Sequence, residues 1–309
     1  MIFNIVLTGN TFWHLRYFVC SIIEQSDARV RLILNACTPG STSEIEDFAR
    51  SHADRVVEVF EASSTAMIAH GVCLDAVRGS RDDGPLFCLI DPDIKARTPF
   101  LGEFRELLST FDAVTSGKEV WTDDNVVPVG ALGVGGRHFY DSRGFVLGSP
   151  HFAMYRRAAL DDTCARWGIG LGSAGPELSD AARARMADAG HAYAVYDTGK
   201  IVNILFQLDG HTLCHFDHPE LVHIGGLSHF ISPPEVGAKS GEVETPTWSR
   251  FGGMEARLAV AQYTALVMRA TIEQRPVPPL PPDLDPPMQA RLELVRTEMV
   301  DLVDRYRDC

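Results

Sequence analysis

Hydrophobic and polar residues along the first 95 positions follow two alternating periodicities. Continuous apolar runs predict strands at 1–7, 30–36 and 56–60. Residues 12–24 carry apolar side chains at helical spacing, and a capping-box pattern at 41–44 predicts the start of a second helix. A third helix is predicted over 64–77. Short strands that alternate with helices indicate an α/β fold, in which helices cover both faces of a parallel sheet.

The fourth predicted strand, Leu86–Ile90, leads directly into two carboxylates, Asp91 and Asp93. Ligands of open α/β sheets bind at the carboxyl ends of the strands. Hard divalent cations prefer carboxylate oxygens, so a metal bound there could clamp a diphosphate and stabilise a leaving phosphate. The alternative is an ordinary turn, since Asp-Pro-Asp is also typical turn chemistry. The preceding buried strand favours the metal site.

The pattern after residue 98 is less regular. Helices are predicted at 99–108, 176–189 and 197–208, and strands from 114, at 145–155 and at 193–196. The stretch at 121–144 is rich in glycine, valine and aspartate and is predicted to be an irregular loop. Gly170–Gly175 matches the G-x-G-x-x-G fingerprint of dinucleotide-binding proteins, and Asp197 follows at about the expected distance. However, residues 161–167 before it have a helical pattern, whereas the fingerprint requires a strand.

Five histidines fall within the next segment: His211, His215, His218, His223 and His229. Their spacings match no compact zinc motif, and no cysteine pair accompanies them, so we expect at most one or two to bind a metal. The stretch 221–229 is the part that most favours a metal ligand. There a predicted strand ends on His223 and a glycine turn follows, which lets the backbone approach a ligand closely.

The C-terminal part has a different organisation. A loop is predicted at 231–248 and a long helix at 254–272, and seven prolines within 276–287 predict an extended spacer. Beyond the spacer, apolar residues recur at spacings of three and four, namely Met288, Leu292, Val295, Met299, Leu302 and Tyr306. This stripe is too short for an isolated coiled coil. We therefore expect the helix to dock on its own domain or on a second copy of the chain, as a homodimer.

Composition narrows the classes of function. The 309 residues carry a formal net charge of −13, which argues against binding nucleic acid or an anionic membrane surface. No apolar stretch approaches the length of a membrane span, and a strand pattern that begins at Ile2 leaves no room for a signal peptide. The seven cysteines form no C-x-x-C pair, which predicts buried free thiols in a reducing, cytoplasmic location.

The order of these features over residues 1–230 resembles the GT-A glycosyltransferases, particularly their family-2-like members. The resemblance is carried by the N-terminal β-α repeats, the DxD-type Asp91-Pro92-Asp93, the acidic residue before a late helix, and the His-Ile-Gly-Gly-Leu-Ser stretch from His223. It implies a three-layer α/β/α sandwich around a mainly parallel sheet. The catalytic domain would span 1–232, with a nucleotide-sugar-binding half at 1–98, an acceptor-binding half at 99–232, and a C-terminal helical extension at 233–309.

The resemblance also implies an activity and a set of site residues. The protein would be a metal-dependent glycosyltransferase of the hexosyltransferase type, which moves a sugar from a UDP- or GDP-sugar to a hydroxyl of a sugar or small molecule. Mn²⁺ or Mg²⁺ would be held by Asp91, Asp93 and His223, with Asp93 the better ligand and His229 the substitute for His223. The residues implied on the nucleotide side are Thr8, Asn10, Asn35, His70, Gly71 and Asp91.

The catalytic base is less clearly indicated. An acceptor hydroxyl has a very high pKa, so a carboxylate must take its proton as the bond forms. Asp197 matches the family's base, but Tyr196 replaces the first residue of the usual acidic pair, so Glu177 and Asp180 stay candidates and the stereochemical outcome stays open. Asp75 stands where the family usually has an asparagine. The other classes of function left open are a nucleotidyltransferase, an NAD-dependent oxidoreductase and a non-catalytic sugar-nucleotide-binding protein.

Overall fold

The computed structural model describes residues 1–230 and 254–309, with side chains at 1–228 and 256–309. The loop predicted at 231–248 and the side chain of His229 lie outside the described residues. The strands are β1 (Ile2–Thr8), β2 (Arg29–Asn35), β3 (Val56–Ser63), β4 (Leu86–Ile90), β5 (Ile94–Ala96), β6 (Ala113–Ser116), β7 (Gly133–Val134), β8 (Phe152–Arg156), β9 (Val195–Tyr196), β10 (Leu213–His215) and β11 (Leu221–His223). The helices are α1 (Phe12–Glu24), α2 (Pro39–Ser51), α3 (His70–Ser80), α4 (Leu101–Thr110), α5 (Arg157–Trp167), α6 (Asp180–Asp188), α7 (Lys200–Leu208), α8 (Leu227–Phe230), α10 (Met254–Ile272) and α11 (Pro286–Arg305).

The central sheet of the described residues has seven strands in the order β10-β6-β8-β4-β1-β2-β3. Strand β8 is antiparallel to both of its neighbours, and the other pairings are parallel. The prediction of an α/β fold around a mainly parallel sheet is therefore confirmed. Both halves expected for the catalytic domain contribute strands to this one sheet, which places the site-bearing ends of β1, β2 and β4 beside the start of β8.

Two hydrophobic clusters cover the two faces of the sheet and give the three layers. One contains buried residues of α1, α2 and α4 together with the C-terminal helices α10 and α11. The other contains buried residues of α3, α5, α6 and α7. Burial on both faces explains the uninterrupted apolar character of β1 and β4, because a strand covered on both sides has no polar face.

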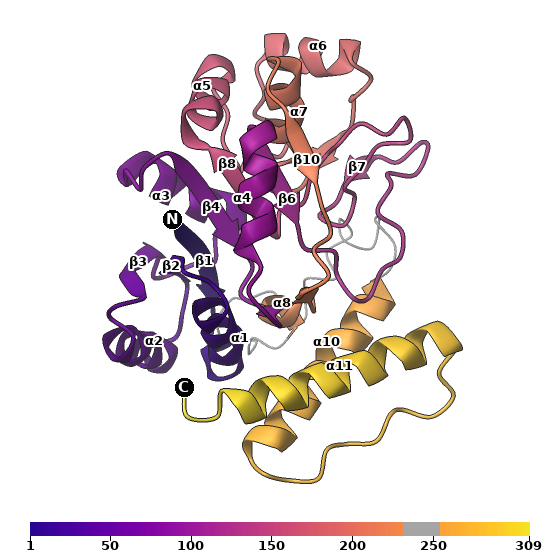
Figure 1. Ribbon diagram of the computed structural model, residues 1–309. Coiled ribbons are helices and arrows are strands. Elements are labelled where there is room, and N and C mark those ends of the chain that lie inside the picture. Colours follow the sequence, from indigo (N-terminus) through magenta and orange to yellow (C-terminus); the bar gives the residue numbers. More distant parts are fainter. Residues whose placement is uncertain (231–253) are drawn as a thin grey trace.

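The C-terminal helices pack on their own chain. Figure 1 shows α10 and α11 side by side, next to α1 and α8, although they come last in the sequence. The apolar stripe of α11 is buried there through Leu292, Val295, Met299 and Leu302. This confirms that the stripe is an interior surface, and its partner is this chain's own α10 and α1.

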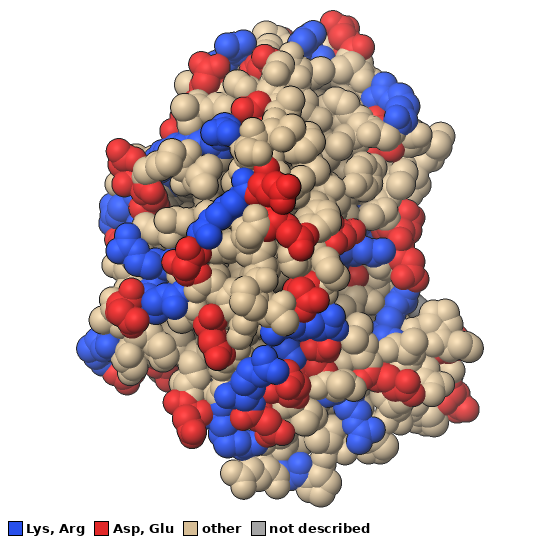
Figure 2. Space-filling view, viewed as in Figure 1, with Lys and Arg blue, Asp and Glu red and all other residues tan. Residues whose placement is uncertain are grey.

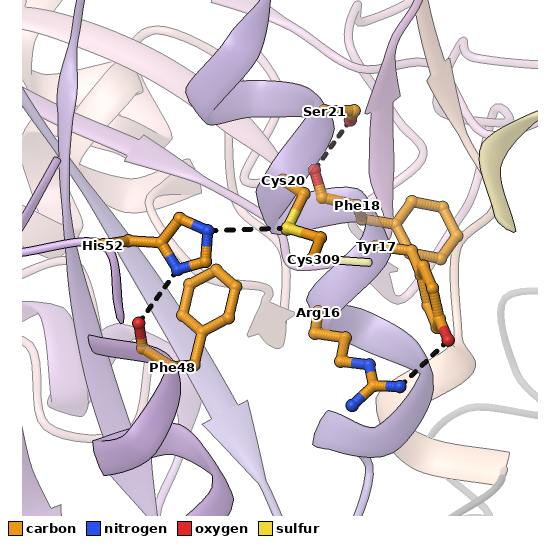
Figure 3. The surroundings of a disulfide bond; sticks show 8 residues. All are labelled: Arg16, Tyr17, Phe18, Cys20, Ser21, Phe48, His52 and Cys309. Atoms are coloured by element: carbon orange, nitrogen blue, oxygen red, sulfur yellow. Dashed lines mark hydrogen bonds between the residues drawn. A yellow bond between two sulfur atoms is a disulfide. The ribbon is translucent and has the colours of Figure 1, made fainter. Parts of the chain in front are cut away.

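The prediction that the cysteines are free thiols is wrong for two of them. Cys20 of α1 and Cys309, the last residue, form a disulfide beside His52 (Figure 3). The two residues are 289 positions apart, so no local pattern relates them. The free cysteines are Cys37, Cys73, Cys88, Cys164 and Cys214. Burial raises the pKa of the Cys88 thiol to about 12, which makes it unreactive.

Several element boundaries differ from the prediction, and three of the differences have a clear local reason. Helix α2 begins at Pro39 with Thr38 as its N-cap, because the Thr38 hydroxyl accepts the Ser41 amide and proline suits the first helical turn. Helix α3 begins at His70, not at 64, since the Asn35 side chain bonds the backbone of Ile68 and holds that segment extended. Strand β8 begins at Phe152 and not at 145, because Gly148 has a left-handed φ of 67° and Pro150 lacks an amide to donate, so the chain is irregular between 147 and 151.

On the face of the molecule in Figure 2, acidic and basic side chains are interspersed over the apolar and neutral surface. None of the helices in the described residues is long and apolar enough to cross a membrane.

Candidate active site

A cavity of about 450 Å³ opens at the carboxyl ends of β1, β2 and β4. Asp91 and Asp93 line it, as expected for carboxylates that follow a central strand. Thr8 at the end of β1, Asn35 at the end of β2 and His70 at the start of α3 also line it. The cavity therefore occupies the edge of the sheet at which the sequence places the nucleotide.

Two antiparallel pairings bring distant histidines to the aspartates. Strand β5 follows Asp93 directly and pairs with β11, so that Ile94 lies opposite His223. Strand β8 pairs with β4, so that Phe152 lies opposite Ile90 and His151 lies beside Asp91. One ligand atom each of Asp91, His151 and His223 lies within 4.8 Å of the other two.

The orientation of His223 is fixed by the backbone. Its Nδ1 lies 2.8 Å from the carbonyl oxygen of Gly117, which can only accept, so Nδ1 carries a proton. The other ring nitrogen, Nε2, is buried and makes no hydrogen bond. It lies 3.2 Å from Oδ1 of Asp93 and 3.8 Å from Oδ2 of Asp91. A proton on Nε2 would pair the ring with Asp93, and a bound cation could take the place of that proton between the ring and the two carboxylates.

Asp93 is held as a carboxylate. Its side chain is buried, and burial alone would favour the neutral acid. His223 and the backbone amide of Leu227, which donates to Oδ2 at 3.1 Å, outweigh burial and lower the pKa of Asp93 to about 2. The carboxylate is therefore charged at neutral pH and available as a ligand.

His151 lies between two carboxylates. Its Nδ1 is 2.9 Å from Oδ2 of Asp91, and its Nε2 is 2.9 Å from Oε1 of Glu119. Although burial favours the neutral ring, Glu119 and Asp91 raise the pKa of His151 to about 10. Burial also opposes ionisation of Glu119, but His151 lowers the pKa of that carboxyl to about 2. With Asp93, the centre contains three carboxylates and one imidazolium, an excess negative charge that suits a divalent cation.

The three candidate bases occupy different surroundings. Asp197 lines the cavity, and its Oδ1 accepts the amide of Thr198. Oδ2 of Asp197 lies 3.1 Å from where a Cβ on Gly136 would be, and Nε2 of His151 lies 3.2 Å from it, so only glycine fits there without displacing them. Glu177 lies outside the cavity lining and accepts the amides of Ala174 and Gly175. Asp180 is the first residue of α6, also outside the lining.

Two residues implied on the nucleotide side do not line the cavity. Asn10 lies in the turn after β1, and Gly71 is buried where α3 meets the loop after α5. A Cβ on Gly71 would come within 2.4 Å of the carbonyl oxygen of Leu171. Gly71 is thus required for close packing of these two segments.

Packing of α3 against the loop after α5 also explains the G-x-G-x-x-G stretch. The Asp75 carboxylate accepts the amides of Leu171 and Gly172, both at 2.9 Å, and a Cβ on Gly170 would clash with that carboxylate. The loop follows helix α5, whereas a dinucleotide fingerprint follows a strand. Its glycines serve helix-to-loop packing, and the stretch gives no support for a dinucleotide site.

The other late histidines have separate partners. The His215 ring lies 3.0 Å from the Thr115 hydroxyl on one side and 3.0 Å from the Asp217 carboxylate on the other. His218 stacks on Phe104, and His211 packs on Phe206. Of the four whose side chains the structure describes, His223 alone belongs to the group around Asp91 that could hold a metal ion, and the side chain of His229 lies outside the described residues.

Sequence reasoning missed His151, Glu119 and an aromatic-cationic wall of the cavity. The Trp121 ring contacts two guanidinium groups, that of Arg137 at 5.7 Å and that of Arg257 at 5.9 Å from the ring centre. All three line the cavity, and Arg257 comes from α10. The Gly-Ser-Pro run at 148–150 could have indicated His151 as the first residue after a strand break, but no signal in the sequence indicates the others.

No family model matches the chain, and no protein of curated function matches its sequence. Solved structures similar to the chain include the mannosyltransferase PcManGT from Pyrobaculum calidifontis in complex with GDP-Man and Mn²⁺, with 16% identity, a TM-score of 0.45, and coverage of 99% of this chain and 82% of that one. The galactosyltransferase LgtC, in complex with donor and acceptor sugar analogues, has 10% identity and a TM-score of 0.42 over 70% of this chain and 73% of that one.

A nucleotide-processing enzyme of a different kind is also similar. The 4-diphosphocytidyl-2C-methyl-D-erythritol synthase from Anaerococcus prevotii has 10% identity and a TM-score of 0.37 over 79% of this chain and 96% of that one. Because similarity at this level does not separate the two chemistries, we infer the function from the side chains of the site.

Proposed function

We propose that the protein is a metal-dependent glycosyltransferase, which moves a sugar from a UDP- or GDP-sugar to a hydroxyl group of an acceptor. The observation that carries the proposal is the position of the buried Nε2 of His223, 3.2 Å from Oδ1 of Asp93 and 3.8 Å from Oδ2 of Asp91. These residues fit Mn²⁺ or Mg²⁺, since they combine carboxylate oxygens, an oriented imidazole and excess negative charge. A cation held there would stabilise the charge that develops on the leaving diphosphate.

The remaining lining residues suit the other parts of such a donor. Arg137 and Arg257 bring positive charge to the cavity, where it would favour a diphosphate. Thr8 and Asn35, at the ends of neighbouring parallel strands, suit the nucleoside end. The hexosyl nature of the sugar and the identity of the acceptor hydroxyl are part of the same proposal.

Asp197 is the proposed base. It is the one candidate among Asp197, Glu177 and Asp180 that lines the cavity. Gly136 leaves open the space between the Asp197 carboxylate and His151, so an acceptor hydroxyl could enter next to Oδ2. The carboxylate would take the hydroxyl proton as the new bond to the sugar forms.

Thermal melting with a panel of nucleoside diphosphates, each with and without Mn²⁺, tests the proposal directly. A ligand at 100 times its dissociation constant should stabilise the fold by about 2.7 kcal/mol. We expect stabilisation by UDP or GDP that requires Mn²⁺. Absence of any metal-dependent shift across the panel would contradict the metal site.

A product assay separates glycosyl transfer from nucleotidyl transfer. A glycosyltransferase releases a nucleoside diphosphate from the donor, whereas a nucleotidyltransferase releases pyrophosphate from a nucleoside triphosphate. When the Asp197→Asn variant is assayed, Glu177→Gln is the matched control, because Glu177 lies outside the cavity lining. Release of pyrophosphate without nucleoside diphosphate would favour the alternative. Metal-dependent binding with no turnover of any donor would favour a sugar-nucleotide-binding protein.

A further inference from the structure

The C-terminal helix α11 makes polar contacts with β5, the short strand that directly follows Asp93. Lys95 in the middle of β5 is 1% exposed. Its Nζ donates to Oε2 of Glu298 and Oδ2 of Asp301, both at 2.7 Å, and to the carbonyl oxygen of Glu298 at 3.0 Å. The three ammonium hydrogens thus have three acceptors, all on α11.

Glu298 holds β5 at a second point. Its Oε1 accepts two hydrogen bonds from the guanidinium of Arg97, at 2.6 and 3.0 Å. Both oxygens of this one carboxylate are therefore occupied by cations on or next to β5. Hydrogen bonds between charged groups are directional, so they fix the position of the strand more sharply than apolar packing would.

Helix α11 is itself anchored firmly. Its apolar stripe is buried against α10 and α1, and Cys309 beyond its end is bonded to Cys20 of α1 (Figure 3). The helix consequently acts as a fixed support on which β5 rests.

The place of β5 determines the geometry of the metal centre. Ile94 pairs with His223, and the amide of Ile224 donates to the carbonyl oxygen of Asp93 at 3.2 Å. The amide of Leu227 donates to Oδ2 of Asp93 at 3.1 Å. A shift of β5 would therefore displace Asp93 relative to His223.

We infer that Lys95 and Glu298 are positioning residues, through which α11 holds Asp93 and His223 in the arrangement that binds the metal. The inference rests on the proposed metal site. It also assigns the C-terminal extension a role in the chemistry, although its helices lie far from Asp93 in the sequence.

The first test measures Mn²⁺ affinity by titration of the metal alone, with free Mn²⁺ followed by electron paramagnetic resonance. Glu298→Gln keeps the size of the side chain, removes its charge and turns an amide toward a cation. Loss of a direct partner of a metal ligand typically weakens metal binding by about 10–100-fold. Glu298 acts on Asp93 through β5, so we expect a loss at the lower end of this range. Glu293→Gln is the matched control, because Glu293 is exposed on the same helix and accepts only from Gln289.

The second test needs no metal. Hydrogen exchange of the Leu227 amide reports the bond to Asp93, and we expect it to be faster in Glu298→Gln than in the parent or in Glu293→Gln. Parental Mn²⁺ affinity and parental exchange in Glu298→Gln, even with a lowered melting temperature, would overturn the inference. A parent that binds no Mn²⁺ would overturn the proposed metal site, while the exchange comparison would still decide whether α11 positions Asp93.

If Glu298→Gln does not fold, a double variant can replace it in these tests. Lys95→Met combined with Glu298→Leu replaces the buried ion pair by apolar contact, which often preserves folding. We expect this double variant to fold and still to bind Mn²⁺ about tenfold or more weakly, since the directional bonds are lost. Parental affinity in the folded double variant would again overturn the inference.

Discussion

The two ends of the central sheet carry buried charged clusters of opposite character. The basal cluster, near the start of the strands, consists of Asn4, Arg31, Glu58, Arg81 and Asp83. Arg31 bonds Asn4, Glu58 and both oxygens of Asp83, and Arg81 bonds Glu58. Each carboxylate oxygen accepts a hydrogen bond, and two guanidinium groups balance two carboxylates.

The site cluster, at the carboxyl ends of the strands, consists of Asp91, Asp93, Glu119, His151 and His223. Here Oε2 of Glu119 and Nε2 of His223 are buried without a hydrogen-bond partner, and negative charge is in excess. Burying unsatisfied polar atoms costs free energy, and a cation bound among these residues would offset that cost. The basal cluster therefore has the features of a structural network, and the site cluster has those of a binding centre.

Removal of Asp93 should have the largest effect of the variants that test this comparison. Asp93→Ala should abolish Mn²⁺ binding and lower turnover by about 10³-fold or more, because a metal supplies several kcal/mol of transition-state stabilisation and each 1.36 kcal/mol is tenfold. The chain should stay folded, as judged by circular dichroism. Turnover within a few-fold of the parent would refute the metal site.

Asp197→Asn should lower turnover by about 10²–10⁴-fold at saturating donor, because an amide cannot accept the hydroxyl proton. The melting temperature and the Mn²⁺ affinity should be close to those of the parent, since asparagine can still accept the Thr198 amide. Glu177→Gln serves as control and should retain turnover. Parental turnover in Asp197→Asn would show that Asp197 is not the base, and a loss in Glu177→Gln alone would assign that role to Glu177.

Arg31→Met, in the basal cluster, should lower stability and leave metal binding unchanged. It leaves the partly buried Asp83 without its cation and Glu58 with Arg81 alone, which should lower the free energy of unfolding by about 3 kcal/mol in a urea titration. Mn²⁺ affinity at low temperature should be unchanged. A selective loss of Mn²⁺ binding would mean that the two clusters are coupled.

The free energy of unfolding at acid pH gives a second test of the Arg31→Met variant. The hydrogen bonds from Arg31 lower the pKa of Asp83, so its contribution to stability is present above the unfolded pKa and is lost as pH falls through the folded value. Arg31→Met removes the cause of this shift. Between about pH 5 and pH 3, the free energy of unfolding should therefore fall less in the variant than in the parent.

Loss of the disulfide should have a smaller effect that leaves both clusters intact. Cys309→Ser should lower the free energy of unfolding by about 2–4 kcal/mol, because the bond restricts the unfolded chain. Addition of a reductant should bring the parent to the same value, and Cys214→Ser, a partly exposed free thiol, should have little effect. A reductant-insensitive parent would contradict the presence of the disulfide in solution.

Much of the fold follows from local pattern. The apolar spacing predicted α1 with its observed bounds, and the run before Asp91 predicted β4. The stripe on α11 predicted its buried face. These predictions succeed because burial of one face or both faces of an element imposes a period on the residues within it. Boundaries were wrong at α2, α3 and β8, where turns and caps compete with that period.

The candidate site was predictable only in part. Asp91, Asp93 and Asp197 are visible because each carboxylate follows a strand pattern, and His223 because it ends one. His151 and Glu119 are not. His151 is placed by the antiparallel register of β4 and β8, 60 residues along the chain from Asp91, and Glu119 by a parallel bridge to His223.

The sequence by itself determined the alternation of strands and helices over the first 95 residues, the buried face of the last helix, and that carboxylates follow the fourth strand. Only the tertiary structure decided which polar groups meet: His151 with Asp91 and Glu119, Lys95 with Glu298, and Cys20 with Cys309. The physical reason is that hydrophobic burial is encoded by periodicity within one element. Pairing of buried charges depends on strand order and register across the whole sheet, for which a single sequence has no local signal.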